Sequence, residues 1–345
     1  MCHSGREYIY SGARIYNVGT DMNTQLRSEA LFHDSRLILS AGTLARATFV
    51  ERVSAAQQAG FNAISLSPAQ YLAAIRREKL SNTNMQEILA EYEVDLDEVD
   101  PLLDWFTSDA LGCETLMVEI GEALGARSIN VATAFVSERP FEELVDCYVR
   151  VCERVAKYGL RADLEFLPWT RVGNLTTALE LLDAADQPNA GVMFDFWHFF
   201  NSGQDLDVLR QLTPRQAARI TSLQLNDMPG SITDLSRGQN WAYAKDMFHN
   251  VIDSVRVLGL DAFLNVAIKA KYPHSGAQKM MKDALCSRLF PGEGAMPVTE
   301  VLAILSQKGV APAIGVEVFN LEHHALSAAD IAMKAMKTLE AVTHR

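Results

Sequence analysis

The chain has 345 residues, of which 48% are hydrophobic and 21% are charged, and it carries a formal net charge of -12 at pH 7. This composition is typical of a soluble globular protein with a large core, and the acidic balance argues against nucleic acid or an anionic membrane surface as the main partner. We find no signal-peptide pattern and no run of about 20 apolar residues, and five scattered cysteines without a C-x-x-C pair favour a reduced, cytoplasmic setting.

From residue 36 onwards, short β-rich runs alternate with longer amphipathic stretches. The eight predicted strands are 36–42, 61–68, 94–99, 128–135, 162–169, 191–199, 220–227 and 313–320. Amphipathic helices are predicted between them, for instance at 48–60 and 140–160, and after the last strand at 327–342. Because strands that alternate with helices form a parallel sheet with right-handed crossovers, the pattern predicts an α/β protein, a (β/α)8 TIM barrel over residues 36–345.

Two segments fall outside this repeat, an N-terminal extension at 1–35 and an insertion at 228–287 after the seventh strand. Within the insertion, 241–260 has the pattern of an amphipathic helix, which predicts a small helical subdomain. Loops that follow barrel strands lie on the catalytic face. The insertion is therefore expected to act either as a lid over that face or as a structural appendage or interface in a homo-oligomer, and the sequence leaves these alternatives open.

Polar side chains interrupt the fifth to the eighth predicted strands. Side chains alternate between the two faces of a strand, and here the apolar neighbours all share the opposite face. Since the apolar face must pack against the helices, the polar residues should point into the barrel, near the C-terminal strand ends where barrel active sites are built. These residues are Glu165, Asp195, Gln224 and Glu317.

Three carboxylates and one amide at the same height would repel one another unless a cation lay between them. Such oxygen donors suit one Mn²⁺ or Mg²⁺ ion, with Co²⁺ or Zn²⁺ as alternatives, and leave room for substrate oxygens. Alternatively, each residue is a separate polar group bonded to water or to an arginine. The matched position in four neighbouring strands favours the metal site.

Four further residues are candidates for this site. His198 follows Asp195 by three residues and could support a ligand or carry a proton. Arg288, beside a glycine-rich turn, could hold a substrate oxygen through charge-assisted hydrogen bonds or could simply be solvated. Trp169 and Trp197 belong to an aromatic group that either binds substrate or packs the barrel.

Five motifs, in this order and spacing, resemble those of the xylose isomerase-like TIM-barrel superfamily, and most of all its sugar phosphate isomerase/epimerase branch. They are LEFLPW at 164–169, FDFWHFF at 194–200, LQLND at 223–227, RLFPGEG at 288–294 and GVEVFN at 315–320. The resemblance covers residues 36–227 and 288–342, so the extension and the insertion depart from it.

The resemblance implies a divalent metal held by a Glu, an Asp, a His and a second Glu. These positions fall on Glu165, Asp195, Gln224 and Glu317. Glutamine at the third position departs from the commoner histidine and is similar to some bacterial 3-dehydroshikimate dehydratases.

The activity that the resemblance implies is proton transfer next to a carbonyl. The first hypothesis is an isomerase or epimerase of a keto sugar or cyclitol that works through an enediolate, with Glu165 and Glu317 as base and acid. The second is a lyase, either 3-dehydroshikimate dehydratase-like or eliminating a keto-glycoside, which acts on a carbohydrate or a cyclic keto-acid and uses His198 to protonate the leaving group. The third is a non-catalytic or partner-dependent subunit that binds a ligand in the barrel and a second chain through the insertion.

Overall fold

The computed structural model describes residues 35–106, 112–132, 139–230, 239–241, 243–245 and 275–343. The predicted N-terminal extension therefore lies outside the described residues, apart from Ser35. Of the predicted insertion, the described parts are its first three residues, two short helical pieces and one helix at its end.

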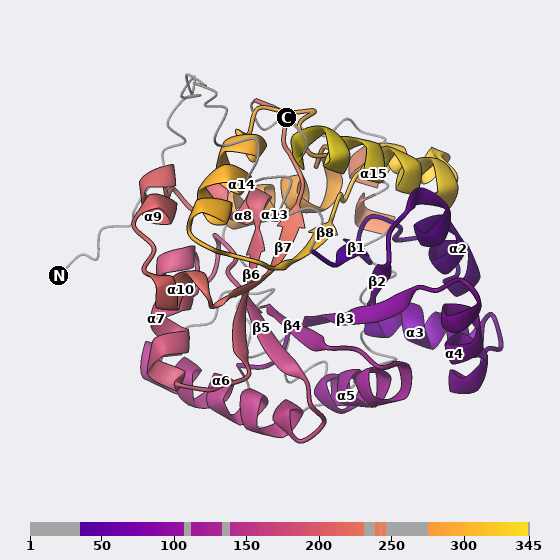
Figure 1. Cartoon of the computed structure of the whole chain (residues 1–345), viewed down its shortest axis with the longest axis horizontal. Coiled ribbons are helices and arrows are strands. Elements are labelled where there is room, and N and C mark those ends of the chain that lie inside the picture. The colour runs from indigo at the N-terminus through magenta and orange to yellow at the C-terminus, as the bar shows by residue number, and fades with distance from the viewer. Residues whose placement is uncertain are drawn as a thin grey trace.

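Eight parallel strands close into a barrel in chain order, and β1 pairs with β8 to complete the ring (Figure 1). The strands are β1 (Leu37–Leu39), β2 (Ala63–Leu66), β3 (Asp95–Leu102), β4 (Ser128–Ala132), β5 (Arg161–Glu165), β6 (Ala190–Asp195), β7 (Ile220–Leu225) and β8 (Ala313–Val316). This arrangement confirms the predicted TIM barrel.

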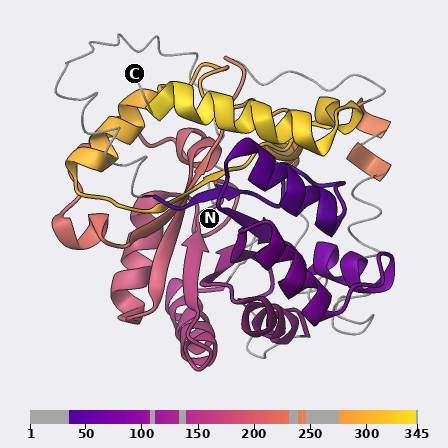
Figure 2. The same ribbon diagram turned by 45° about the vertical axis from the view of Figure 1, so that its right-hand side comes forward.

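Helices surround the barrel on the outside (Figure 1). They are α2 (Phe49–Ala59), α3 (Pro68–Arg76), α4 (Asn82–Glu91), α5 (Gly112–Leu124), α6 (Phe141–Ala156), α7 (Leu175–Ala185), α8 (Phe196–Asn201), α9 (Leu206–Arg210), α10 (Pro214–Ala217), α13 (Ser275–Cys286), α14 (Val298–Gln307) and α15 (Ala328–Thr343), with the 3₁₀ helix η1 (Leu321–Ala325). The last helix, α15, lies beside α2 and so joins the two ends of the repeat (Figure 2). No helix in the described ranges is long and apolar enough to cross a bilayer.

The barrel is stabilised by the apolar faces of its strands. Leu164 and Phe166 at the end of β5, and Val192 and Phe194 in β6, are fully buried in one hydrophobic core with the helices. Burial of each such side chain stabilises the fold by about 1.5–3 kcal/mol. Their polar neighbours consequently face the barrel interior, as the alternation of side chains predicts.

The sixth predicted strand, 191–199, is too long. The strand ends at Asp195, whose Oδ1 accepts a hydrogen bond from the backbone N–H of His198 at 2.8 Å and caps the N-terminus of α8. An aspartate cap stabilises a helix start, and this outweighs the strand preference of the aromatic run that follows. His198 therefore lies on the first turn of a helix.

Candidate active site

The four residues predicted as metal ligands lie together at the C-terminal mouth of the barrel. Glu165 and Asp195 are the last residues of β5 and β6, Gln224 is the penultimate residue of β7, and Glu317 directly follows β8. Asp195 and Gln224 are register partners, and the backbone N–H of Glu317 still bonds to Leu225 of the neighbouring strand at 3.0 Å. All four side chains are buried.

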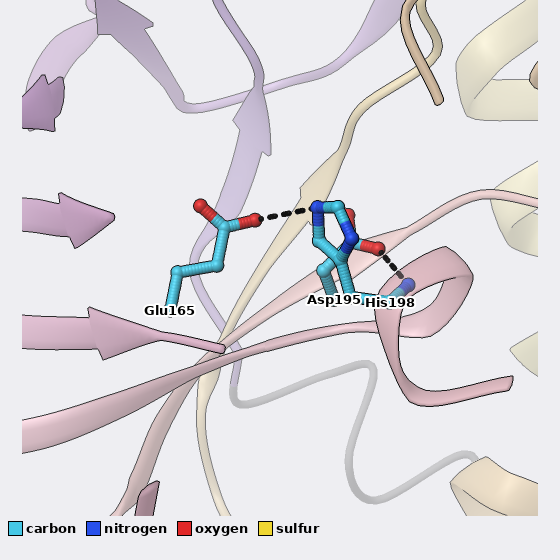
Figure 3. A group of neighbouring side chains, drawn as sticks. All are labelled: Glu165, Asp195 and His198. Atoms are coloured by element: carbon cyan, nitrogen blue, oxygen red, sulfur yellow. Dashed lines mark hydrogen bonds and ion pairs between the residues drawn. The ribbon is translucent and has the colours of Figure 1, made fainter. Parts of the chain in front are cut away.

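Glu165, Asp195 and His198 form the tightest cluster (Figure 3). One ligand atom from each lies within 4.8 Å of the other two. His198 Nε2 is 3.3 Å from Glu165 Oε1, while Asp195 holds the backbone of His198 through the helix cap. The structure thus brings the predicted histidine into direct contact with a predicted ligand.

Arg288 links two of the predicted metal ligands, Asp195 and Glu317. Its Nη1 donates to Asp195 Oδ2 at 2.7 Å and to Glu317 Oε2 at 3.1 Å. Gln224 Nε2 donates to the other oxygen of Glu317 at 3.3 Å. Arg288 is 2% exposed, so these charge-assisted bonds form largely out of contact with water.

The site carries more negative than positive charge. Burial raises the pKa of Glu317 well above its usual value despite the opposing effect of Arg288, and the charges of Asp100 and Glu165 raise it further. Burial also raises the pKa of Asp100 to about 7, with Glu165 adding to the shift. Glu165, Asp195 and Glu317, if ionised, face one guanidinium, and the excess of two negative charges is what a divalent cation would balance.

The donor set also fits such a cation. Gln224 Oε1 is buried and has no hydrogen-bond partner among the described residues, although a buried amide oxygen normally has one. Carboxylate and amide oxygens are suitable ligands for Mn²⁺ and Mg²⁺, and a nearby imidazole also suits Zn²⁺. Among the described His, Cys, Asp and Glu residues, Glu165, Asp195 and His198 form the group close enough to hold such an ion, and ligation by Gln224 and Glu317 stays a prediction.

Three polar residues of the site, Asn130, Asp100 and Asn226, were not predicted from the sequence. Asn130 in β4 donates from Nδ2 to both Glu165 Oε2 and Asp100 Oδ1, each at 2.9 Å. Asn226, just after β7, donates to Asp195 Oδ2 at 2.9 Å. Asn130 is flanked in its strand by apolar Ile129 and Val131, so the alternation used for the later strands places its side chain inside the barrel.

A buried aspartate holds the loop that carries Arg288. The carboxylate of Asp227 accepts hydrogen bonds from four backbone N–H groups, those of Met228, Gly292, Gly294 and Met296. The backbones of Asp227 and Leu289 also exchange two hydrogen bonds of 2.8 Å. Two of the motifs quoted above, LQLND and RLFPGEG, are thus parts of one local structure.

The two predicted aromatic residues lie against His198. The ring centroids of Trp169 and Trp197 are 5.4 and 5.3 Å from that of His198, in edge-on geometry. Trp197 is fully buried, and its indole nitrogen donates to Asp283 Oδ2 at 3.2 Å. Substrate contact by Trp169 and by Trp197 stays a prediction.

Residues 53–342 match the family model described as xylose isomerase-like TIM barrel, and the chain belongs to this family. It is 23% identical to an inosose isomerase of Bacillus velezensis over 238 residues, 66% of each chain. It is 35% identical to a 3-dehydroshikimate dehydratase of Bacillus anthracis over 83 residues, 24% of this chain and 30% of that one. The chain thus matches just under two thirds of the inosose isomerase and a smaller part of the dehydratase.

Among solved structures, the fold resembles that of the protein IOLI, crystallised with a bound zinc atom. The TM-score is 0.66 at 18% identity, and the match covers 89% of this chain and 98% of that chain. At this identity the likeness establishes the fold alone.

Proposed function

We propose that this protein is a divalent-metal-dependent isomerase or epimerase of a neutral keto sugar or cyclitol ketone, such as an inosose. The observation that carries the proposal is the position of Glu165. One of its carboxylate oxygens is fixed by Asn130, and the other lies 3.3 Å from His198, within the group of Glu165, Asp195 and His198 that could hold a metal ion. A carboxylate held in this way is placed to remove a proton next to a substrate carbonyl.

Each residue has a role that its contacts support. A divalent ion held by this donor set would polarise the substrate carbonyl. Glu165 would remove the α-proton, and His198 would steady the carboxylate and the developing charge. Glu317 would return the proton from its place after β8, where Gln224 and Arg288 hold its carboxylate.

The contacts of Arg288 support a neutral substrate. Its guanidinium already donates to Asp195, to Glu317 and to the carbonyl of Ala284. These bonds occupy three of its five N–H groups, and Nη2 lies 3.4 Å from His198 Nε2, so no free pair of N–H groups is left for a two-bond contact with an acidic group of the substrate. With a divalent ion bound, the charges of the four ligands and Arg288 would also balance without an anion.

Solvent isotope exchange tests this proposal. The Mn²⁺-loaded protein is incubated with inososes and ketoses in D₂O, and we expect deuterium at the carbon next to the carbonyl in recovered substrate and product. Glu165→Gln should abolish the exchange while circular dichroism shows an intact fold. If no candidate ketone that binds acquires deuterium, the isomerase proposal is wrong.

A second candidate function is dehydration of a keto compound. It is favoured by Gln224 at the third ligand position and by the 83-residue similarity to a dehydratase. His198, buried beside Glu165, would protonate the departing hydroxyl. Growth of an enone absorbance with 3-dehydroshikimate, without deuterium in recovered substrate, would support this function over isomerisation.

A further inference from the structure

Helix α13 is the described end of the predicted insertion, and it leads directly to Arg288. It lies beside α8, which carries Trp197 (Figure 1). Two consecutive residues of its last turn contact the site. Asp283 Oδ2 accepts the hydrogen bond from Trp197 at 3.2 Å, and the Ala284 carbonyl accepts one from Arg288 Nε at 2.7 Å.

Trp197 transmits this contact to the reacting part of the site. Its ring meets that of His198 nearly at right angles, with centroids 5.3 Å apart, and Trp169 packs edge-on against it at 6.2 Å. The guanidinium carbon of Arg288 lies 6.0 Å from the Trp197 ring centroid, at the limit of a cation–π contact. The indole of Trp197 therefore contacts both the imidazole of His198 and the guanidinium of Arg288.

The hydrogen bond gives one oxygen of the buried Asp283 carboxylate a donor, while Oδ1 has no hydrogen-bond partner among the described residues. Asp283 is 4% exposed and Trp197 is 0% exposed. A buried carboxylate is unfavourable unless hydrogen bonds replace its water, and a buried indole N–H, which can only donate, needs an acceptor. A leucine at position 283 would fill apolar space without this requirement, but it could not fix the orientation of the indole.

We infer that Asp283 is a positioning residue of the active site and that α13 forms a fixed wall of it. By holding the Trp197 indole, Asp283 sets where the His198 ring lies beside Glu165. For α13, this role differs from the predicted lid and from the predicted oligomer interface. Its effect on turnover rests on the proposed isomerase activity, whereas its effect on Trp197 does not.

Indole NMR tests the structural half of the inference. The chain has four tryptophans, so ¹⁵N-tryptophan labelling gives four indole N–H signals, which Trp→Phe variants assign. We expect Asp283→Ala to move the Trp197 signal upfield and to shift that of Trp169, while Asp283→Asn, which keeps an acceptor oxygen, leaves both near their original positions. Asp283→Ser, which is too short to reach the indole, serves as a second variant if Asp283→Ala does not fold.

Kinetics test the functional half. Asp283→Ala should lower kcat roughly 10- to 100-fold with little change in KM, because a displaced histidine affects the transition state more than binding. Asp283→Asn should restore most of kcat. In a Trp197→Phe background, which has no indole N–H, Asp283→Ala should lower kcat no further.

Glu114→Gln is the matched control, since Glu114 is also a buried carboxylate that joins two elements, through its ion pair with Arg154. It should reduce stability without moving the Trp197 signal. An unmoved Trp197 signal in Asp283→Ala or Asp283→Ser would overturn the inference, as would additive kcat losses in the double variant. If no turnover is found with any substrate, the indole signals still decide whether Asp283 fixes Trp197.

Discussion

Asn130 Nδ2 lies 2.9 Å from Glu165 Oε2 and, through the same nitrogen, ties the proposed base to Asp100. We expect Asn130→Ala to weaken Mn²⁺ binding and to lower kcat, each by about 10- to 100-fold, because partners of metal ligands fix the orientation of those ligands. Calorimetric Mn²⁺ titration and steady-state kinetics measure the two effects.

The matched control is Asn189→Ala. Asn189 also donates two hydrogen bonds, but to the carbonyls of Cys152 and Leu160, and it lies before β6, away from the mouth. It should lower stability and leave Mn²⁺ affinity unchanged. Equal losses of affinity in both variants would show that Asn130 has no specific role.

Metal binding should stabilise the fold, because the donors converge only in the folded state. At an Mn²⁺ concentration about 100 times the dissociation constant, the gain is about 2.7 kcal/mol. We expect Tm to rise with Mn²⁺ and to return with a chelator. Gln224→Leu removes the amide oxygen that has no hydrogen-bond partner, so the rise in Tm with Mn²⁺ should be much smaller in this variant. Gln224→His, which supplies a ring nitrogen as a ligand, should keep the full rise in Tm.

The guanidinium of Arg288 should contribute most to the stability of the fold when no metal is bound. Arg288→Met leaves Asp195 and Glu317 buried without their cation, and loss of one partner of a buried ion pair costs about 3–5 kcal/mol. Urea unfolding in chelator should show this loss, and Mn²⁺ should reduce it. Arg210→Met, which breaks exposed ion pairs to Asp207 and Glu300, should change stability by at most about 1 kcal/mol. A loss that grows on adding Mn²⁺ would contradict the charge balance argued above.

Asp100 should make the metal-free protein less stable as the pH rises from about 4 to about 7. The pKa of Asp100 is raised from 3.8 to about 7 in the fold, so between these values the folded chain keeps a proton that the unfolded chain has lost. Stability therefore decreases with rising pH across this window. Asp100→Asn should reduce the slope of the unfolding free energy against pH between 4 and 7 by up to about 1.4 kcal/mol per pH unit. Asp207→Asn, at an exposed position, should leave this slope unchanged. An unchanged slope in Asp100→Asn would show that Asp100 does not have the raised pKa.

Much of the barrel mouth was predictable because a strand alternates its side chains with a fixed period. That period alone places Glu165, Asp195, Gln224 and Glu317 inside the barrel, and consecutive parallel strands place them side by side. Asn130 obeys the same rule, but one polar residue in an apolar strand does not by itself indicate a site.

Other contacts depend on distances that no local pattern contains. The bonds from Arg288 to Asp195 and Glu317 join positions 93 and 29 residues apart, through a loop outside the repeat. The bond between Trp197 and Asp283 depends on how the insertion packs. The start of α8 was missed for a local reason, since the aromatic run after Asp195 favours a strand until the aspartate cap is considered.

The paired backbones of Asp227 and Leu289 have a consequence for the evolution of this barrel. The chain leaves the seventh strand and returns toward the eighth through the same short antiparallel bridge, so the two ends of the intervening stretch are tied together. The closure entropy of such a stretch rises by only about 0.6 kcal/mol for each doubling of its length. Residues can thus be inserted or deleted beside the barrel mouth while the pairing of β7 with β8 stays the same. Substrate selectivity can then change while the side chains at the strand ends keep their positions.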